Sequence, residues 1–165
     1  MIYLVLYVLF ILPFNGKDRL QTSNAILEVS QEFKYSKKDT MQWVALLAQE
    51  SAFNTKAVNK RSGTLGIGQI SPRYLKSFQK SVGLPNNPLT LVGGLRLSAY
   101  VFKKCLGTYK DHRRRYACYF AGRLNPCTVH LEKNKDLCPE TYRHALAVEN
   151  KYLLIRTYLD LDKTL

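Results

Sequence analysis

The chain has 165 residues, of which 46% are apolar, so it can bury a core within a single domain. This composition excludes an intrinsically disordered or low-complexity protein. Lysine and arginine outnumber aspartate and glutamate by 25 to 12, which gives a formal net charge of +13. Such a charge attracts nucleic acid, anionic lipid or acidic cell-wall polymer without choosing among them.

The first fourteen residues, Met1 to Phe14, form an uncharged apolar run that Lys17 follows closely. A run of this length is typical of the apolar part of a secretory signal, whereas a helix that spans a bilayer needs about 20 residues. No basic residue precedes the run, and no small-residue cleavage site follows it closely. We expect residues 1–16 to be an export signal or a short uncleaved membrane anchor. A buried N-terminal helix is the alternative, and cleavage is left open.

The rest of the chain predicts helices separated by turns. Asp39 and Gln42 resemble a capping box, which predicts that a helix starts near Thr40 and runs to about Ser51. Pro72 is typical of the first turn of a helix. With no long run of strand-like alternation, the sequence predicts a mainly α fold. The other helices are predicted at residues 26–33, 72–81, 91–106, from 116 to about 120, and from 139 past 152.

Four cysteines, Cys105, Cys118, Cys127 and Cys138, all lie in the C-terminal half. Their even number suits an oxidising compartment and up to two disulfides, whose pairing the sequence does not reveal. Plain buried thiols are one alternative. A metal site is another, but the spacings of 13, 9 and 11 residues match no zinc pattern. We expect no metal and no cofactor.

A single carboxylate stands at the end of the apolar helix predicted at residues 40–51. Trp43, Leu46 and Glu50 share one face of this helix, so Glu50 is expected to point towards the core. No lysine or arginine lies between residues 40 and 55. A carboxyl group in apolar surroundings is poorly hydrated in its charged form, which favours the protonated form that a general acid needs. Most glutamates are solvated and have no catalytic role, so the position of Glu50 alone does not distinguish a catalytic residue from an ordinary surface residue.

Short motifs accompany this glutamate in a fixed order. In chain order they are Glu50-Ser51, Phe53-Asn54, Ala57-Val58, Gly66-Ile67-Gly68-Gln69, Ile70 with Pro72, Pro88 to Gly94 with Tyr100, Ala117 to Gly122, and Pro139 to Tyr142. Together they closely resemble the signature of lytic transglycosylases, in the goose-type lysozyme superfamily. The resemblance covers about residues 35–152. Departures from the pattern are Gly68, Phe120, the residues Arg123-Leu124-Asn125, and the insert from Cys127 to Cys138.

The resemblance implies a mainly α, lysozyme-like (goose-type) single domain with a substrate cleft over residues 26–156, followed by a tail at 157–165. It implies Glu50 as the catalytic residue. The implied substrate-binding residues are Ser51, Gly66, Gln69 and Tyr119. Of these, Tyr119 can donate to Glu50 and orient it, with a core tyrosine as the alternative reading, and the glycines can also belong to a plain turn.

Most glycosidases use two carboxylates, about 5 Å apart for retention or roughly 6.5–9.5 Å apart for inversion. Glu50 is the one good candidate in this sequence. Asp111 lies in a charged stretch typical of a solvated turn, and Glu140 lies at a helix start, where the dipole favours a carboxylate. One acid is enough where an N-acetyl group of the substrate supplies the nucleophile. The resemblance implies this chemistry on the β-1,4 bond between N-acetylmuramic acid and N-acetylglucosamine, with a 1,6-anhydro product.

The expected partner is therefore the glycan strand of peptidoglycan, on the periplasmic side of a bacterial envelope. We expect a monomer without a specific nucleic-acid partner. We also expect association with the inner membrane through residues 1–14. Contact with envelope-spanning machinery or with a phage particle is a further expectation. Arg113-Arg114-Arg115 is predicted to be a solvated face, with binding of wall peptides or phosphates as the alternative.

Other functions stay open at this point. A muramidase of the same fold that uses water, or a chitin-cleaving enzyme, is the nearest alternative. A catalytically silent wall-binding or assembly component would use the basic surface alone. A nucleic-acid-binding module rests on charge only, because no motif of that class is present. The source organism and the pathway served, whether wall turnover, secretion, conjugation or phage infection, are not readable.

Overall fold

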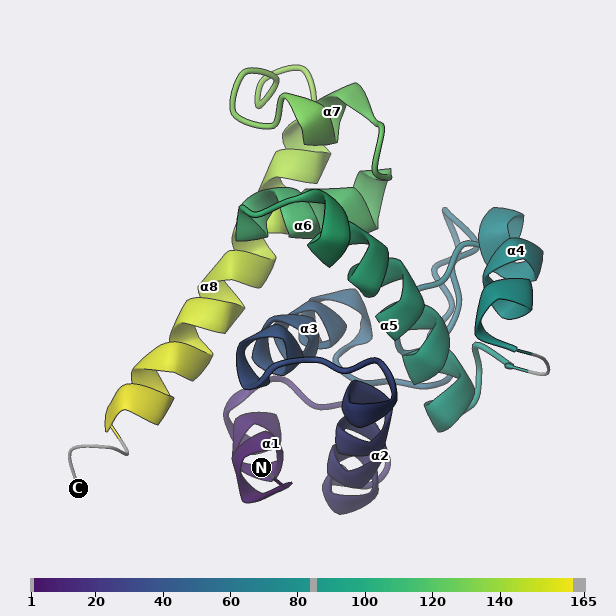
Figure 1. The fold of residues 1–165 in the computed structure, drawn as a ribbon, viewed down its shortest axis with the longest axis vertical. Coiled ribbons are helices and arrows are strands. Elements are labelled where there is room, and N and C mark those ends of the chain that lie inside the picture. Colours follow the sequence, from purple (N-terminus) through teal and green to yellow (C-terminus); the bar gives the residue numbers. More distant parts are fainter. Residues whose placement is uncertain (1, 84–85, 162–165) are drawn as a thin grey trace. The chain divides into compact units, whose positions relative to one another are not determined.

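The computed structural model describes residues 2–83 and 86–161, and within them the chain is mainly helical, as predicted (Figure 1). The chain divides into two compact units, residues 1–100 and residues 101–165. The helices are α1 (Ile2–Ile11), α2 (Arg19–Glu32), α3 (Lys37–Ser51), α4 (Pro72–Val82), α5 (Leu91–Thr108), α6 (His112–Ala121), α7 (Pro126–Val129) and α8 (Pro139–Leu161).

In the first unit, α1 lies beside α2 (Figure 1). One side of α1 is buried, through Val5, Val8, Leu9 and the following Leu12. Arg19 Nε donates to the Leu9 carbonyl at 3.2 Å, which satisfies one of the carbonyls left open at the end of α1. The structure thus shows α1 as a helix packed on its neighbour, the alternative reading of this segment, and its role in export or anchoring stays a prediction.

Among the described residues, none of the helices combines the length and the apolar character that crossing a membrane requires.

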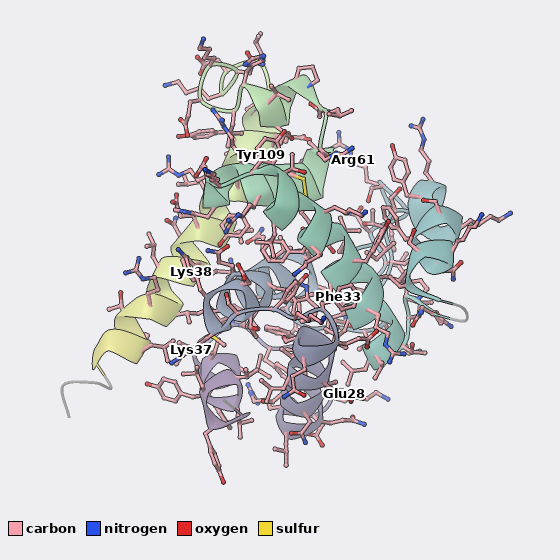
Figure 2. The ribbon with its side chains drawn as sticks, viewed as in Figure 1. Glu28, Phe33, Lys37, Lys38, Arg61 and Tyr109 are labelled. Carbon is pink, nitrogen blue, oxygen red and sulfur yellow. A yellow bond between two sulfur atoms is a disulfide. The ribbon has the colours of Figure 1, made fainter. Side chains whose placement is uncertain are left out.

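The helix α3 starts earlier than predicted. Its N-cap is Ser36, whose hydroxyl accepts from Asp39 N, while the Asp39 carboxylate accepts from Ser36 N. The capping box is therefore Ser36 with Asp39, not Asp39 with Gln42, because Asp39 already lies inside the helix. Figure 2 shows Lys37 and Lys38 at this end of α3. The predicted end at Ser51 is confirmed.

The core of the first unit is built on α3. All residues from Thr40 to Ala48 are buried. Trp43 Nε1 donates to Ser98 Oγ of α5 at 2.9 Å, so the one polar atom of the indole is satisfied inside the core. Tyr35, just before α3, donates to the Ala99 carbonyl at 2.6 Å. These bonds tie the beginning of α3 to α5.

In the second unit, α6 packs against α8. Disulfides join Cys105 to Cys118 and Cys127 to Cys138, so the disulfide prediction is confirmed and the pairing is now known. The first bond links the end of α5 to α6. The second joins Cys127 of α7 to Cys138 and closes the insert between them, which has few buried side chains to hold it.

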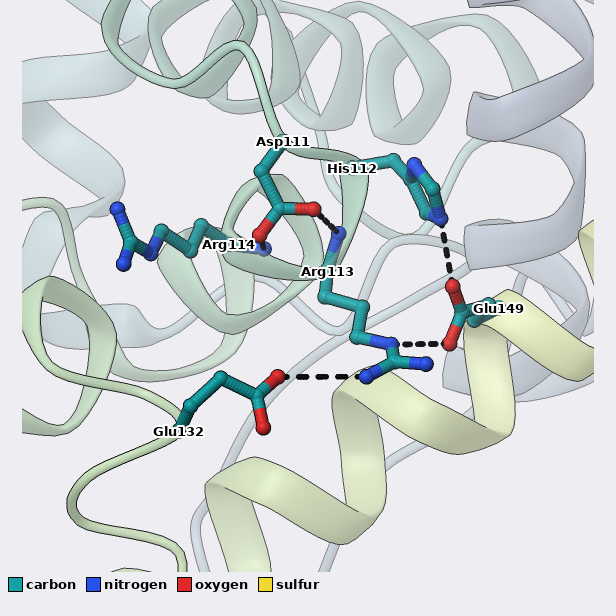
Figure 3. Close-up of polar contacts among 6 residues, drawn as sticks. All are labelled: Asp111, His112, Arg113, Arg114, Glu132 and Glu149. Atoms are coloured by element: carbon teal, nitrogen blue, oxygen red, sulfur yellow. Dashed lines mark hydrogen bonds and ion pairs between the residues drawn. The ribbon is translucent and has the colours of Figure 1, made fainter.

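Glu149 of α8 holds the beginning of α6 (Figure 3). Its side chain is only 8% exposed, and its carboxylate pairs with His112 Nε2 at 2.6 Å and with Arg113 Nε. Arg113 also reaches Glu132 at 3.3 Å. The hydrogen bond to Glu149 raises the pKa of the Arg113 guanidinium above its ordinary value. Arg113, predicted to belong to a solvated face, keeps 37% of its side chain exposed, while its guanidinium is engaged in this ion-pair cluster.

Candidate functional site

The candidate acid, Glu50, lies in the last turn of α3. It is half-buried, as is Gln49 before it, and both follow a helix segment that is buried throughout. The sequence predicted that Glu50 points towards the core, and the structure shows it half-buried, with part of its surface exposed to solvent. The helix dipole disfavours a carboxylate at a helix C-terminus, so helix stability does not explain this residue.

A backbone turn of unusual geometry follows Glu50 and Ser51. Ala52 and Phe53 both have left-handed conformations, with φ of 49° and 65°, although neither is glycine. Such residues cost of order 1 kcal/mol each, so surrounding contacts must hold them. The Phe53 side chain is fully buried and stacks on Phe14, with ring centroids 5.6 Å apart, while Asn15 N donates to the Ala52 carbonyl at 2.6 Å. Residues 14 and 15, assigned to the N-terminal segment by sequence, thus brace the turn behind Glu50.

Ser51 joins the end of α3 to the glycine loop. Its hydroxyl donates to the Ile67 carbonyl at 2.8 Å. The Ile67 side chain is fully buried and anchors the loop from the other side. Leu65 and Ile70 exchange two backbone hydrogen bonds, of 3.0 and 2.8 Å, which close the loop at its base. The structure therefore brings Ser51, next to Glu50, against the predicted glycine loop.

Gly66 is required by both its conformation and its surroundings. Its φ is +72°, and a Cβ at this position would overlap the carbonyl oxygen of Pro88 and lie 2.8 Å from the carbonyl carbon. No larger residue fits without moving the backbone. The close approach of two backbone segments, rather than contact with a sugar, is therefore what the structure shows at Gly66.

Gln69 holds the loop from within. Its Oε1 accepts from Thr64 Oγ1 at 2.8 Å, and its Nε2 donates to the carbonyls of Gly66, at 2.9 Å, and Ala57, at 3.5 Å. Its own backbone is left-handed, with φ of 48°. Both amide hydrogens are thus engaged inside the loop, and only Oε1 retains unused acceptor capacity.

The sequence did not single out Thr64, and it pointed to Pro88 only as the start of a motif, not as a neighbour of the glycine loop. Thr64 lies five residues before Gln69, and a hydroxyl residue at the entrance of a glycine loop is a signal that could have pointed to it. Pro88 is far from Gly66 in sequence, and no local pattern predicts their contact.

Tyr119, the remaining predicted site residue, lies on α6 in the second unit and is half-buried. Its helix is fixed by the disulfide of Cys118 and by the buried side chain of Tyr116. The contact between Tyr119 and Glu50 stays a prediction. The following residue, Phe120, stacks on His144 with ring centroids 4.5 Å apart, so this departure from the family pattern is used within the second unit.

Several other carboxylates have structural roles. Asp18 accepts from Gln21 N as the N-cap of α2, and Glu32 pairs with Arg96 at 2.8 Å. Asp111, exposed as the predicted solvated turn requires, is the N-cap of α6 and accepts from the backbone of Arg113 and Arg114 (Figure 3). Glu140 lies in the first turn of α8, as predicted.

Within residues 2–83 and 86–161, no group of three or more histidine, cysteine, aspartate or glutamate side chains could hold a metal ion.

Comparison with known proteins places these residues in a family. The family described as Transglycosylase SLT domain matches residues 30–136, a stretch that contains Glu50, the glycine loop and Tyr119. No curated protein matches the sequence. Among solved structures, an X-ray structure of an inactive glutamate-to-glutamine mutant of the lytic transglycosylase Slt from Pseudomonas aeruginosa is similar, with a TM-score of 0.66 at 18% sequence identity.

That similarity covers 83% of this chain and only 24% of the Pseudomonas chain, and at this identity it shows the fold. The predicted lytic transglycosylase fold and the family resemblance are both confirmed. Because the family match extends over well over half of the sequence, from α2 to the insert after α7, the chain belongs to the Transglycosylase SLT domain family.

Proposed function

We propose that this chain is a peptidoglycan lytic transglycosylase in which Glu50 acts first as acid and then as base. The observation that carries the proposal is the position of Glu50, half-buried in the last turn of α3 and adjacent to the Ser51 that holds the glycine loop. The name of the similar Pseudomonas structure describes a glutamate-to-glutamine mutant as inactive, which supports an essential glutamate in this fold.

The proposed reaction needs a single protein carboxyl group. Protonated Glu50 gives its proton to the glycosidic oxygen, and the bond from that oxygen to C1 of N-acetylmuramic acid breaks as the acetamido oxygen bonds to C1. The Glu50 carboxylate then takes the proton of the C6 hydroxyl of the same sugar. The C6 oxygen bonds to C1 and displaces the acetamido oxygen, which closes the 1,6-anhydro ring. The proton returns to Glu50, and no water is consumed.

The surroundings of the other carboxylates support a single acid. In the same unit as Glu50, Asp18, Glu32 and Asp39 serve helix caps or an ion pair, and Glu28 lies exposed on α2. A carboxylate already bound to backbone amides or to an arginine is poorly placed to act as the second catalytic group of a hydrolytic pair.

The neighbours of Glu50 have narrower roles in this proposal than the sequence suggested. Ser51 donates its hydroxyl hydrogen to the Ile67 carbonyl. Its oxygen can therefore only accept a hydrogen bond from the substrate, for example from the acetamido N–H. Gln69 likewise can offer the sugar only Oε1, and its main role is to hold the loop. Tyr119 is proposed to donate to Glu50 and to fix the direction of its carboxyl group.

The two disulfides fit an oxidising compartment outside the cytoplasm, where peptidoglycan lies. We therefore propose the periplasm or cell envelope as the site of action. Glycan strands are the proposed partner, and assembly with envelope machinery or a phage particle belongs to the same proposal.

The product of digestion tests the proposed reaction. Purified sacculi are incubated with the full chain, and the released muropeptides are analysed by mass spectrometry before and after borohydride reduction. We expect anhydro ends, lighter than hydrolytic ends by one water and resistant to reduction. Reducing N-acetylmuramic acid ends would instead assign the chain as a muramidase of the same fold. If the chain binds sacculi but releases no muropeptides, a wall-binding component would be favoured.

A further inference from the structure

The outward side of α1 carries a row of aromatic residues. Tyr3, Tyr7 and Phe10 lie at positions i, i+4 and i+7 and therefore share one face of the helix. Their exposed fractions are 83%, 42% and 65%. The residues between them, Val5, Val8 and Leu9, are fully buried on the opposite side. We call Tyr3, Tyr7 and Phe10 the α1 aromatic face.

The direction of this face is fixed by contacts at the end of α1. Arg19 Nε binds the Leu9 carbonyl, Phe14 stacks on Phe53, and Asn15 N binds the Ala52 carbonyl. Because these contacts tie α1 to α2 and to the turn after α3, the helix cannot roll to hide its aromatic residues without breaking them. The α1 aromatic face is therefore a stable surface of the first unit.

One cationic residue, Arg19, borders the face, and a second, Lys17, lies close by in sequence. The Arg19 guanidinium lies 5.0 Å from the centroid of the Phe10 ring and 4.7 Å from that of Phe14. Lys17 is exposed in the connection between α1 and α2. Tyrosine is enriched where a protein meets the membrane interface, and basic residues beside such a surface pair with anionic headgroups.

We propose that the α1 aromatic face docks the protein on an anionic lipid surface, with α1 lying in the plane of the interface and its other side packed on α2. Aromatic rings on one side of a helix and flanking cations are the combination that interfacial helices use. A second copy of the chain is a poorer occupant, because each chain carries a net charge of +13 and like charges repel. This proposal does not depend on the enzymatic function, so each can fail alone.

Vesicle binding of the full chain tests the proposal. The probe is vesicles of phosphatidylglycerol and phosphatidylcholine in equal amounts, with pure phosphatidylcholine vesicles for comparison, and bound protein is measured by flotation. We expect Tyr3→Ser, Tyr7→Ser and Phe10→Ser together to weaken binding to the mixed vesicles by about tenfold or more, because most of the inserted apolar area is lost. These side chains are exposed, so the thermal midpoint should hardly change.

A second triple variant, with the same net charge, controls for the loss of exposed apolar side chains outside the α1 aromatic face. Tyr74→Ser, Leu124→Ser and Leu137→Ser remove three other exposed apolar side chains and leave the net charge at +13. We expect this variant to bind as the unchanged chain does. Equal binding by both triple variants would show attraction by charge alone and overturn the proposal. Loss of a dimer in sedimentation, with vesicle binding unchanged, would assign the face to a second copy and overturn it as well.

Fluorescence gives a second measurement that does not require the triple variant to fold. The natural tryptophan, Trp43, is fully buried. The variant Tyr7→Trp places an indole on the α1 aromatic face, and Tyr74→Trp places one on α4 as the control. We expect brominated phosphatidylcholine, mixed with phosphatidylglycerol, to quench the added emission of Tyr7→Trp and not that of Tyr74→Trp. Equal quenching in both variants would contradict the proposal.

Discussion

Two glutamates, Glu50 in the first unit and Glu149 in the second, lie in opposite surroundings. Glu149 has a side chain only 8% exposed, and His112 and Arg113 bind its two oxygens (Figure 3). Glu50 lies half-buried at the end of its helix, adjacent to a braced turn and the glycine loop. Nearly complete burial therefore marks the structural carboxylate, whereas a partly exposed helix end beside the glycine loop marks the catalytic candidate.

The largest expected effect comes from exchanging each carboxylate for its amide. We expect Glu50→Gln to lower muropeptide release by roughly 10²–10⁴-fold, because an amide cannot donate and retake the proton. Its free energy of unfolding should stay within about 1 kcal/mol, since a neutral side chain suits the end of a helix. Activity is measured by chromatography of released muropeptides and stability by thermal unfolding.

Glu149→Gln is the matched control for this experiment. It makes the same chemical change at a more buried carboxylate, and we expect its activity loss at low temperature to be far smaller. Unchanged wall cleavage by Glu50→Gln would remove Glu50 from the mechanism. Equal activity losses in the two variants would mean that any buried carboxylate of the fold is needed for activity, and that the position of Glu50 beside the glycine loop is not special.

The next largest effect tests the loop that distinguishes the surroundings of Glu50. We expect Gly66→Ala to abolish activity and to cost about 3 kcal/mol or more, because the added Cβ overlaps the Pro88 carbonyl. Gly63→Ala is the control, since Gly63 has nearly the same φ, +71°, with its nearest contact at 4.0 Å. It should cost only about 1–2 kcal/mol of backbone strain. Similar losses of stability in both variants would mean that the positive φ of the glycine, and not the contact with Pro88, determines the cost.

Much of the arrangement around Glu50 could be predicted from sequence because its signals are local. Pro72 marks the first turn of α4, and Glu50-Ser51 with the Gly-x-x-Gln loop carries the family signature. The start of α3 was misplaced although its signal is also local, because Ser36 and Asp39 form a capping box with aspartate in the place usually taken by glutamate or glutamine.

The remaining features depend on contacts between residues distant in sequence. Arg113 reads as one of three solvated arginines until α8 brings Glu149 beside it, 36 residues later. Phe14 reads as part of an apolar leader until the turn after α3 places Phe53 against it. Four cysteines allow three pairings, and only the fold selects one. Packing, not composition, decides each of these cases.

Stability measurements sharpen the structural side of the comparison. We expect Glu149→Gln to lower the free energy of unfolding by about 1–3 kcal/mol, less than for a fully buried pair, because His112 and Arg113 are more than one third exposed. Glu132→Gln, whose carboxylate is largely exposed, should change it by less than about 0.5 kcal/mol. Chemical denaturation of both variants checks this order, and a larger loss in Glu132→Gln would contradict it.

The smallest expected effect concerns Tyr116, which lies in α6 three residues after Arg113. Its side chain is fully buried, and its hydroxyl has no hydrogen-bond partner among the described residues. Burial, with smaller effects of Tyr152 and Glu149, raises the pKa of the Tyr116 phenol above its ordinary value. We expect Tyr116→Phe to be as stable as the unchanged chain at neutral pH, or more stable by up to about 1 kcal/mol, because an unsatisfied polar group is removed from the core.

The raised pKa of Tyr116 predicts how stability changes with pH. Above about pH 10, an unfolded chain releases the Tyr116 proton, whereas the folded chain keeps it. The folded state then binds more protons, so its stability falls as the pH rises. Denaturation at neutral pH and above pH 10 should show a steeper loss for the unchanged chain than for Tyr116→Phe. Parallel losses would mean that the phenol ionises as easily in the folded chain as in the unfolded one, which would contradict the raised pKa. A marked loss of stability in Tyr116→Phe at neutral pH would mean that the hydroxyl has a hydrogen-bond partner that stabilises α6.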